Sequence, residues 1–323
     1  MTVGDLSTEA AGDAAGPSAW DITRLQGTRA RQRREARVRI LAFAAAATSI
    51  LISGLIVYSL VFEAIKFMIE VEWATLVNDL GWFPRRNLFD VPTLIVATLW
   101  VTVIAMLVAT PLGLAAAIYL AEYASSRVRK ILKPILEILA GIPSVVLGYF
   151  ALRFIAPNII SNLFTSAAPA NIAAAGIGVG LLTIPLVASI SEDSLGAVPR
   201  ELREASSGLG ARKMTTTLRV VVPAALSGLT AAFIVGTSRA VGETMVVYIA
   251  GGAADATQRS FDPLDPGLTM TAAMASVASG TDQVRGVGPT FQSLFFIGLL
   301  LFVMTLALNT FADRFVRRFR QEY

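Results

Sequence analysis

The sequence contains no cysteine and no histidine among its 323 residues. It therefore forms no disulfide, thiolate nucleophile or iron–sulfur cluster, and it lacks the usual zinc ligands. Histidine is also the commonest general base and pH-sensitive side chain. Charged residues are scarce too, at 15%, against about a quarter in soluble domains. With 54% hydrophobic residues and a mean hydropathy of +0.64, this composition indicates a large integral membrane domain.

The first 37 residues differ from the rest of the chain. They begin with small and acidic residues and end in an arginine-rich run at 29–37. Because such a composition buries little apolar surface, we predict a flexible tail over 1–37. A cleavable signal peptide is disfavoured, since the polar lead is too long and the next apolar segment is long enough to span a bilayer. The arginine run favours a juxtamembrane cytoplasmic anchor over a nucleic-acid site.

Long apolar runs make up most of the remaining sequence. Each meets or exceeds the ~20 residues that a helix needs to cross about 30 Å of hydrocarbon. The sequence does not show the alternating segments of about ten residues that are typical of a membrane barrel. We therefore predict an all-α membrane protein with six spans, at about 38–63, 91–118, 132–155, 173–192, 223–250 and 291–312.

Proline and glycine interrupt several of these spans. Pro111, Pro143 and Pro185 are expected to kink or break spans two, three and four. Small residues are expected to let neighbouring helices approach closely, namely Gly141, Gly148, Gly176, Gly178 and Gly180.

Cationic residues are distributed unequally between the two sides of the predicted bundle. Twenty of the 27 lysines and arginines lie in the tail, near the connections after spans two and four, or in the C-terminal segment, whereas six lie on the opposite side. By the positive-inside rule, the first side is cytoplasmic, so both termini are cytoplasmic. We predict a tail at 1–37, a first span with its external connection at 38–90, and a core at 91–323 with a cytoplasmic loop at 193–222.

The polar loop between spans four and five has its own helical pattern. Two short helices are expected there, over 200–207 and 211–218, with Pro199 near the start of the first. Gly208 and Gly210 permit a sharp bend between them, because glycine tolerates positive φ. The loop is therefore expected to be a stiff helix–glycine–helix elbow that transmits motion from a partner to the spans.

The same loop resembles a motif of ABC importer permeases, Glu-Ala-Ala-x3-Gly-x9-Ile-x-Leu-Pro. The sequence keeps the spacing with Glu204-Ala205-Ser206, Gly210 and Val220-x-Val222-Pro223. The departures are Ser206 for the second alanine and valines for isoleucine and leucine. The resemblance implies that Glu204, Ala205, Gly210 and Pro223 engage an ATPase.

The sequence has no Gly-x4-Gly-Lys-[Ser/Thr] phosphate loop. We therefore expect a transporter subunit without enzymatic activity, no cofactor or metal in this chain, and ATP and Mg bound by a partner ATPase.

Further stretches resemble the phosphate-specific ABC importer, in particular its PstC-type permease subunit. They lie at 105–113, 118–123, 140–146, 191–194 and 238–245, and the resemblance covers about 90–323. It implies a six-helix type I importer permease (MetI-like) in the bacterial cytoplasmic membrane. The implied partners are a second permease of the PstA type, a homodimeric ATPase of the PstB type, an external phosphate-binding protein of the PstS type and the lipid bilayer, with no nucleic acid.

Two charged residues lie within predicted span five. Arg239 is 16 residues beyond Pro223, about 24 Å along a straight helix at 1.5 Å per residue. An intramembrane arginine should face the bundle or water, and Glu243 at i+4 can pair with it. Because guanidinium offers a planar fork of donors to phosphate oxygens, we predict that Arg239 and Glu243 form part of the substrate path. The alternative is a structural ion pair. Glu137 lies near the inner end of span three, which favours an interfacial or helix-end role for this residue.

Other functions remain open at this point. The cargo could be another oxyanion, such as sulfate or molybdate, or an amino acid. The chain could also be a membrane scaffold that senses phosphate without transporting it. An autonomous secondary carrier is disfavoured by the coupling motif.

Overall fold

The computed structural model describes residues 29–77, 79–252, 259–279 and 288–319. It divides into two units, Met1–Tyr58 and Ser59–Tyr323. Helix α1 (Arg29–Glu70) belongs to both, and it begins well before the predicted span start at 38. The arginine, alanine and glutamine residues at its start have high helix propensity, which explains this extension into the predicted tail. Residues 1–28 of that tail lie outside the described residues.

All other described elements belong to the second unit. In chain order they are η2 (Trp73–Leu76), β1 (Trp82–Phe83), η3 (Pro84–Arg86), β2 (Leu88–Phe89), α2 (Val91–Ile118), η4 (Tyr119–Tyr123), α3 (Ser126–Ala140), α4 (Ser144–Phe150), η5 (Ala151–Ile160), α5 (Ser161–Leu163), α6 (Ile172–Gly196), α7 (Arg200–Gly208), α8 (Lys213–Thr216), η6 (Thr217–Val221), α9 (Val222–Ala224), α10 (Leu226–Val241), α11 (Met245–Ala250), α12 (Met270–Ala278) and α13 (Pro289–Phe319).

Five helices among the described residues are long and apolar enough to cross a membrane. They are Arg34–Glu70, Val91–Tyr123, Ser144–Leu163, Ile172–Gly196 and Pro289–Arg314. A sixth crossing is formed if the bent pair Lys213–Ala224 and Leu226–Val241, whose axes differ by 70°, counts as one span. These helices confirm predicted spans one, two, four and six, whereas spans three and five differ in form.

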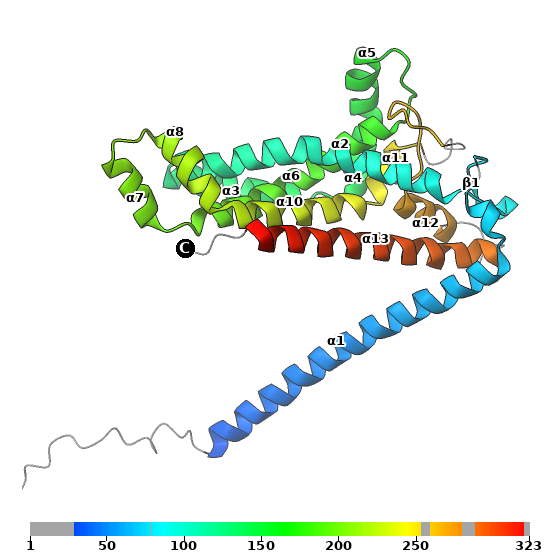
Figure 1. Cartoon of the computed structure of the whole chain (residues 1–323), viewed down its shortest axis with the longest axis horizontal. Coiled ribbons are helices and arrows are strands. Elements are labelled where there is room, and N and C mark those ends of the chain that lie inside the picture. The colour runs from blue at the N-terminus through cyan, green and yellow to red at the C-terminus, as the bar shows by residue number, and fades with distance from the viewer. Residues whose placement is uncertain (1–28, 78, 253–258, 280–287, 320–323) are drawn as a thin grey trace, which may run out of the picture. The chain divides into compact units, whose positions relative to one another are not determined.

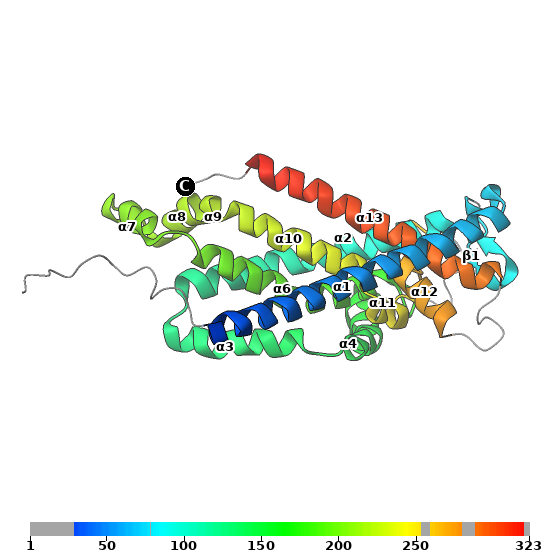
Figure 2. The ribbon, with the colours of Figure 1, turned by 90° about the horizontal axis from the view of Figure 1, so that it is seen from below.

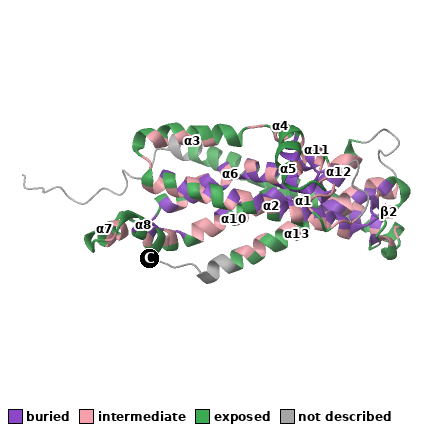
Figure 3. Cartoon of the chain, turned by 90° about the horizontal axis from the view of Figure 1, so that it is seen from above, coloured by how far each residue is buried: buried purple, intermediate pink, exposed green. Residues whose placement is uncertain are grey.

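The third predicted span, 132–155, is not one helix. Helix α3 ends at Ala140 and α4 begins at Ser144, so the chain breaks at Gly141–Pro143. Pro143 causes the break, because proline has no amide to donate and restricts the residue before it. Helix α3 has no buried residue, and Figure 3 shows it largely exposed beside the buried α6. The apolar crossing of this region is instead Ser144–Leu163.

Helix α6 is the centre of the second unit. It packs against α2, α3, α10, α11 and η5, while α13 packs against α10. Figures 1 and 2 show α2, α6, α10 and α13 running alongside one another, with α7 and α8 at one end and α12 and the short strands at the other.

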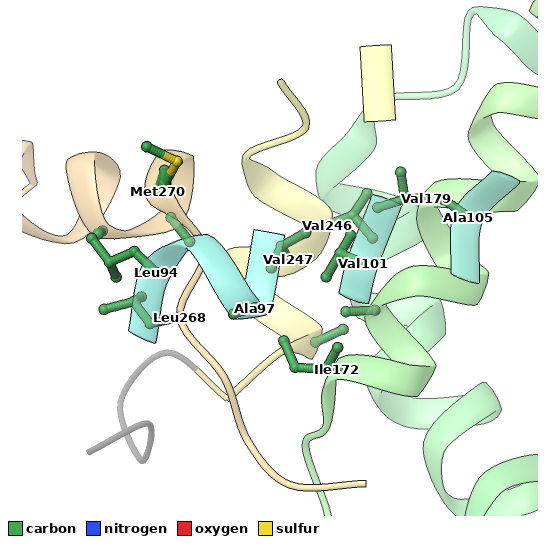
Figure 4. Packing of buried hydrophobic residues seen from close by; sticks show 14 of the residues in the cluster. Leu94, Ala97, Val101, Ala105, Ile172, Val179, Val246, Val247, Leu268 and Met270 are labelled. Atoms are coloured by element: carbon green, nitrogen blue, oxygen red, sulfur yellow. The ribbon is translucent and has the colours of Figure 1, made fainter. Parts of the chain in front are cut away.

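A large apolar cluster joins α2, α6, η5, α11 and α12. Leu94, Ile155 and Met270 are among its fully buried side chains. Figure 4 shows side chains of α2, α6 and α11 meeting within it. Because lipid tails are as apolar as these side chains, such a cluster holds by shape and van der Waals contact more than by exclusion of water.

Glycines bring α2 and α6 into close contact, as predicted. A Cβ built on Gly176 would lie 2.7 Å from Ile104 Cβ, and one built on Gly180 would lie 3.0 Å from the Ala105 carbonyl oxygen. No side chain larger than hydrogen fits at these positions without a shift. The rigid α2–α6 pair therefore supports the elements that surround it.

A small antiparallel sheet interrupts the otherwise helical fold. Trp82 of β1 pairs with Phe89 of β2, and Asn87 between them adopts positive φ, at 55°. Asp90, the residue that follows β2, is fully buried and accepts a 2.8 Å hydrogen bond from Arg259. This ion pair fastens the segment after α11 to the start of α2.

Candidate functional site

A cavity of about 790 Å³ opens beside α6 in the second unit. It lies among α3, α6, α10 and the break that follows α10. Its lining includes Lys133, Leu136, Glu137, Ala140, Leu182, Pro185, Leu186, Ser189, Glu192, Val235, Ser238, Arg239, Gly242 and Glu243. Both predicted substrate-path residues, Arg239 and Glu243, therefore line the same cavity.

Arg239 lies in the last turn of α10. Its side chain is exposed to the cavity and makes no hydrogen bond or ion pair among the described residues. The predicted straight path of about 24 Å from Pro223 is wrong, because the chain bends by 70° between α9 and α10. A cation that lines a cavity and pairs with none of the residues described is available to an anionic ligand that enters the cavity.

Glu243 lies in a break, not on a continuing helix. Helix α10 ends at Val241, and Gly242 follows as its C-cap. Glu243 is 9% exposed, and its Oε1 accepts a hydrogen bond of 3.4 Å from the Val246 amide. The predicted helical pair with Arg239 is therefore not formed, since the i+4 geometry requires a helix that has already ended. Gly242, with Thr244 two residues later, was a sequence signal for this break, because glycine and threonine have low helix propensity.

An ion-pair network at the same cavity was not assigned from the sequence. Arg129 of α3 approaches Glu192 Oε1 of α6 at 2.6 Å through Nη2 and at 2.7 Å through Nε. Lys133 Nζ lies 3.4 Å from both Glu192 Oε2 and Asp193 Oδ1. Glu192 is only 1% exposed. A carboxylate at the end of an apolar span was the available signal, but its partners Lys133 and Arg129 lie far away in the chain, the latter by 63 residues.

Glu137 also lines the cavity, one helical turn after Lys133. Its side chain is exposed and makes no hydrogen bond or ion pair among the described residues. The cavity thus holds cations and carboxylates together, a lining suited to transient contact with a charged ligand. Within the part of the chain that the structure describes, no three acidic side chains come together to hold a metal ion.

The predicted helix–glycine–helix elbow is confirmed in the loop after α6. Helix α7 ends at Gly208, Gly210 adopts a φ of +80°, and α8 begins at Lys213. Leu209 at its tip is 90% exposed.

The predicted coupling residues are all on the surface of this region. Glu204 and Ala205 lie on α7, Gly210 lies at the bend, and each is exposed. Pro223 is also exposed, but it does not open the long helix as predicted. It lies in α9, before the 70° bend, and α10 begins at Leu226. All four remain accessible to a partner from the elbow side.

Residues 109–321 match the family of binding-protein-dependent transport system inner membrane components. The chain is 33% identical over 231 residues to the probable ABC transporter permease protein YqgH of Bacillus subtilis, covering 71% of this chain and 73% of the relative. It is 31% identical over 257 residues to the phosphate transport system permease protein PstC of Mesorhizobium japonicum, covering 74% and 76%. A PstC 1 protein of Mycobacterium bovis is 30% identical over 283 residues, covering 79% and 82%.

Solved structures of importers share the fold. The MetNI methionine ABC transporter in an inward-facing conformation matches with a TM-score of 0.52 at 20% identity, over 70% of this chain and 94% of that one. A bacterial importer of alginate matches with a TM-score of 0.57 at 14% identity, over 90% and 100%. These matches confirm the predicted MetI-like helical fold, and together with the family match they show that the chain belongs to the binding-protein-dependent transport system inner membrane components, the permeases of ABC importers.

Proposed function

We propose that this permease is of the PstC type and moves inorganic phosphate inward across a bacterial cytoplasmic membrane. ATP hydrolysis in a separate ATPase drives the movement, and that partner binds ATP and Mg. The observation that carries the phosphate assignment is Arg239, which lines a cavity of about 790 Å³ and has no ion-pair partner within the described part of the chain. The phosphate permeases among the relatives support it.

Arg239 supplies the chemistry for oxyanion contact. Guanidinium stays charged at all relevant pH values and presents parallel donors that match two phosphate oxygens. Placing an arginine within a membrane protein costs roughly 2.5–3.5 kcal/mol on insertion scales, so a cation with no protein partner needs another compensation. An anion passing through the cavity supplies it transiently.

The carboxylates around Arg239 keep this contact weak. Glu137, Glu192 and Glu243 line the same cavity. Conduction requires a site that attracts its ligand without retaining it. Buried Glu243, fixed by the Val246 amide, opposes tight retention of phosphate without neutralising Arg239 through a direct ion pair.

The elbow of α7 and α8 supplies the contact with the ATPase. Glu204 and Leu209 are exposed on it, and the side chain of Glu204 makes no hydrogen bond or ion pair among the described residues. An exposed leucine beside a carboxylate suits a groove with an apolar floor and a cationic rim. We place this elbow and both termini on the cytoplasmic side, with a PstA-type permease, a PstB-type ATPase dimer and an external PstS-type protein completing the importer.

The test is ATP-driven uptake of labelled phosphate into proteoliposomes that contain the whole importer. We expect Arg239→Gln to lower uptake at least tenfold and Glu243→Gln to lower it several-fold, since both changes remove a charge and leave a polar side chain. Thr237→Val is the matched control, because Thr237 lies on α10 away from the cavity and donates only to the Phe233 carbonyl.

Wild-type uptake in both charge variants would contradict the assignment of Arg239 and Glu243 to the substrate path. If labelled sulfate or molybdate were taken up as fast as phosphate, the assignment of phosphate as the cargo would have to be replaced. Stable assembly without any ATP-dependent flux would favour the phosphate-sensing scaffold.

A further inference from the structure

Helix α7 is attached to the bundle by very few contacts. It contains no buried residue. Leu202 rests on a small apolar cluster, formed by Ala117, Leu195, Val198, Val221 and Ala225. Ser206 Oγ and Thr216 Oγ1 share a hydrogen bond of 2.9 Å across the elbow. These contacts alone leave α7 weakly held at one end of the second unit, where Figure 1 shows it with α8.

Arg203 makes the strongest attachment. Its Nη2 and Nε donate to Glu122 Oε1 at 2.9 and 3.1 Å. Nη2 also donates to the Leu195 carbonyl at 2.8 Å, and Nη1 donates to the Val198 carbonyl at 2.6 Å. The Arg203 side chain is 23% exposed and that of Glu122 is 8% exposed. The charge-assisted bonds are therefore largely shielded from water.

Two of the acceptors of Arg203 lie at the ends of the two central helices, and the Val198 carbonyl lies in the short segment between α6 and α7. Glu122 lies in η4, the π-helical turn that continues α2, and Leu195 lies in the last turn of α6. Helices α2 and α6 are the pair brought together by Gly176 and Gly180. The arginine thus connects α7 directly to the most tightly packed part of the bundle.

A second connection runs along the chain itself. From α8 it passes through η6 and α9 and turns by 70° into α10, the helix of Arg239. This route contains a bend, and a bend can absorb a displacement. The Arg203 contact bypasses it, because Glu122 lies in η4 at the end of α2 and Leu195 lies in the last turn of α6.

We propose that the Arg203–Glu122 ion pair is a coupling strut. It makes α2 and α6 follow α7 when the ATPase displaces the elbow, so that the motion reaches the cavity instead of being absorbed at the bend. This inference rests on the proposed function, since it requires an ATPase that acts on the elbow. Arg203 and Glu122 are positioning residues, because neither touches the cargo.

The strut predicts loss of coupling, which differs from loss of assembly or of ATP hydrolysis. In proteoliposomes that contain the whole importer, we expect Arg203→Ala and Glu122→Gln to keep ATP hydrolysis within twofold of the parent rate. Phosphate moved per ATP should fall at least tenfold. Arg203→Lys keeps the charge but has fewer donors, so its ratio of phosphate moved to ATP hydrolysed should lie between those of the parent and Arg203→Ala. Arg127→Ala is the control, since Arg127 is exposed near the same end and has no ion pair among the described residues.

An unchanged ratio of phosphate to ATP in both Arg203→Ala and Glu122→Gln would overturn the strut. A parallel fall of hydrolysis and transport would also overturn it, since it would indicate a general structural role. Absence of ATP-driven phosphate uptake in the parent importer would instead contradict the proposed function.

A measurement that needs no cargo tests the strut separately. Because the chain has no cysteine, spin labels can be placed at Gly208→Cys on α7 and Leu112→Cys on α2 without further changes to this subunit. In the parent importer, we expect the distance between the labels to stay the same with and without ATP and vanadate, because α7 and α2 move together. With Arg203→Ala added, the distance should shift or broaden on trapping. A shift already present in the parent, or none in the variant, would refute the strut.

Discussion

The two ends of the second unit are held together by different forces. At one end, the large apolar cluster packs α2, α6, α11 and α12 through fully buried side chains such as Leu94 and Met270. At the other end, the small apolar cluster is supplemented by ion pairs that reach across the chain, Arg203–Glu122 and Arg129–Glu192. Helices α3 and α7, which supply the cations, contribute no buried residue.

This difference separates a fixed region from one built to transmit motion. Close packing against small residues resists displacement, because even a small gap forfeits van der Waals contact. An ion pair is directional and connects two bodies at a point, so that helices can rotate about it while staying joined. Cavity residues Lys133, Glu192 and Arg239 lie on α3, α6 and α10, so that displacement of α3 or α10 changes their spacing.

The largest effect should follow from overfilling the fixed region. A Cβ on Gly180 would lie 2.9 Å from Val108 Cβ and 3.0 Å from the Ala105 carbonyl oxygen. Gly180→Leu should lower the free energy of unfolding by about 3 kcal/mol, because the backbone of α2 cannot move away to make room for the new side chain. Thermal unfolding of the purified protein in detergent measures this change.

Gly196 provides the matched control on the same helix. It ends α6, and a Cβ there would have no neighbour within 4 Å. Gly196→Leu should therefore change stability by less than about 0.5 kcal/mol. Equal destabilisation by the two substitutions would contradict the close α2–α6 contact.

A smaller effect is expected from the ion pair between α3 and α6, and it should depend on which partner is removed. Glu192 has 2% of its side chain exposed, whereas Arg129 has 43%. Arg129→Gln leaves a buried carboxylate with only Lys133, and it should cost about 2 kcal/mol, less than the roughly 3–5 kcal/mol of a fully buried pair. Glu192→Gln leaves cations that water can reach and should cost about 1 kcal/mol or less. Thermal unfolding of the two variants measures both costs. If Arg129→Gln and Glu192→Gln lower the free energy of unfolding equally, the burial of Glu192 does not determine the cost of breaking the pair.

The sequence predicted the fold where the physical signal was local. Runs of apolar residues placed α2, α6 and α13, and the glycines at 208 and 210 indicated the elbow that Gly210 forms with positive φ. Each of these features depends on neighbouring residues or on helical spacing. The break at Gly141–Pro143 was also visible as a proline, but hydropathy alone continued the span across it.

The candidate site was predicted in part. Arg239 and Glu243 were identified as intramembrane charges, and both line one cavity. Their pairing was wrong, because α10 ends at Val241 and Glu243 lies beyond it in a break. The partners of Glu192 and Arg203 depend on which helix ends meet, and one sequence contains no record of that.

The smallest effect tests a directional bond inside the fixed region. Thr98 Oγ1 of α2 accepts from the Met270 amide at 3.1 Å and donates to the Leu94 carbonyl at 2.7 Å. Thr98→Val keeps the shape but leaves a buried amide without its acceptor, which should cost about 1 kcal/mol. Thr102→Val is the control one turn on, because Thr102 donates only to the Thr98 carbonyl. If the thermal midpoints of both variants equal that of the parent, α12 is held to α2 by apolar contact alone, and the contrast between the two ends becomes sharper still.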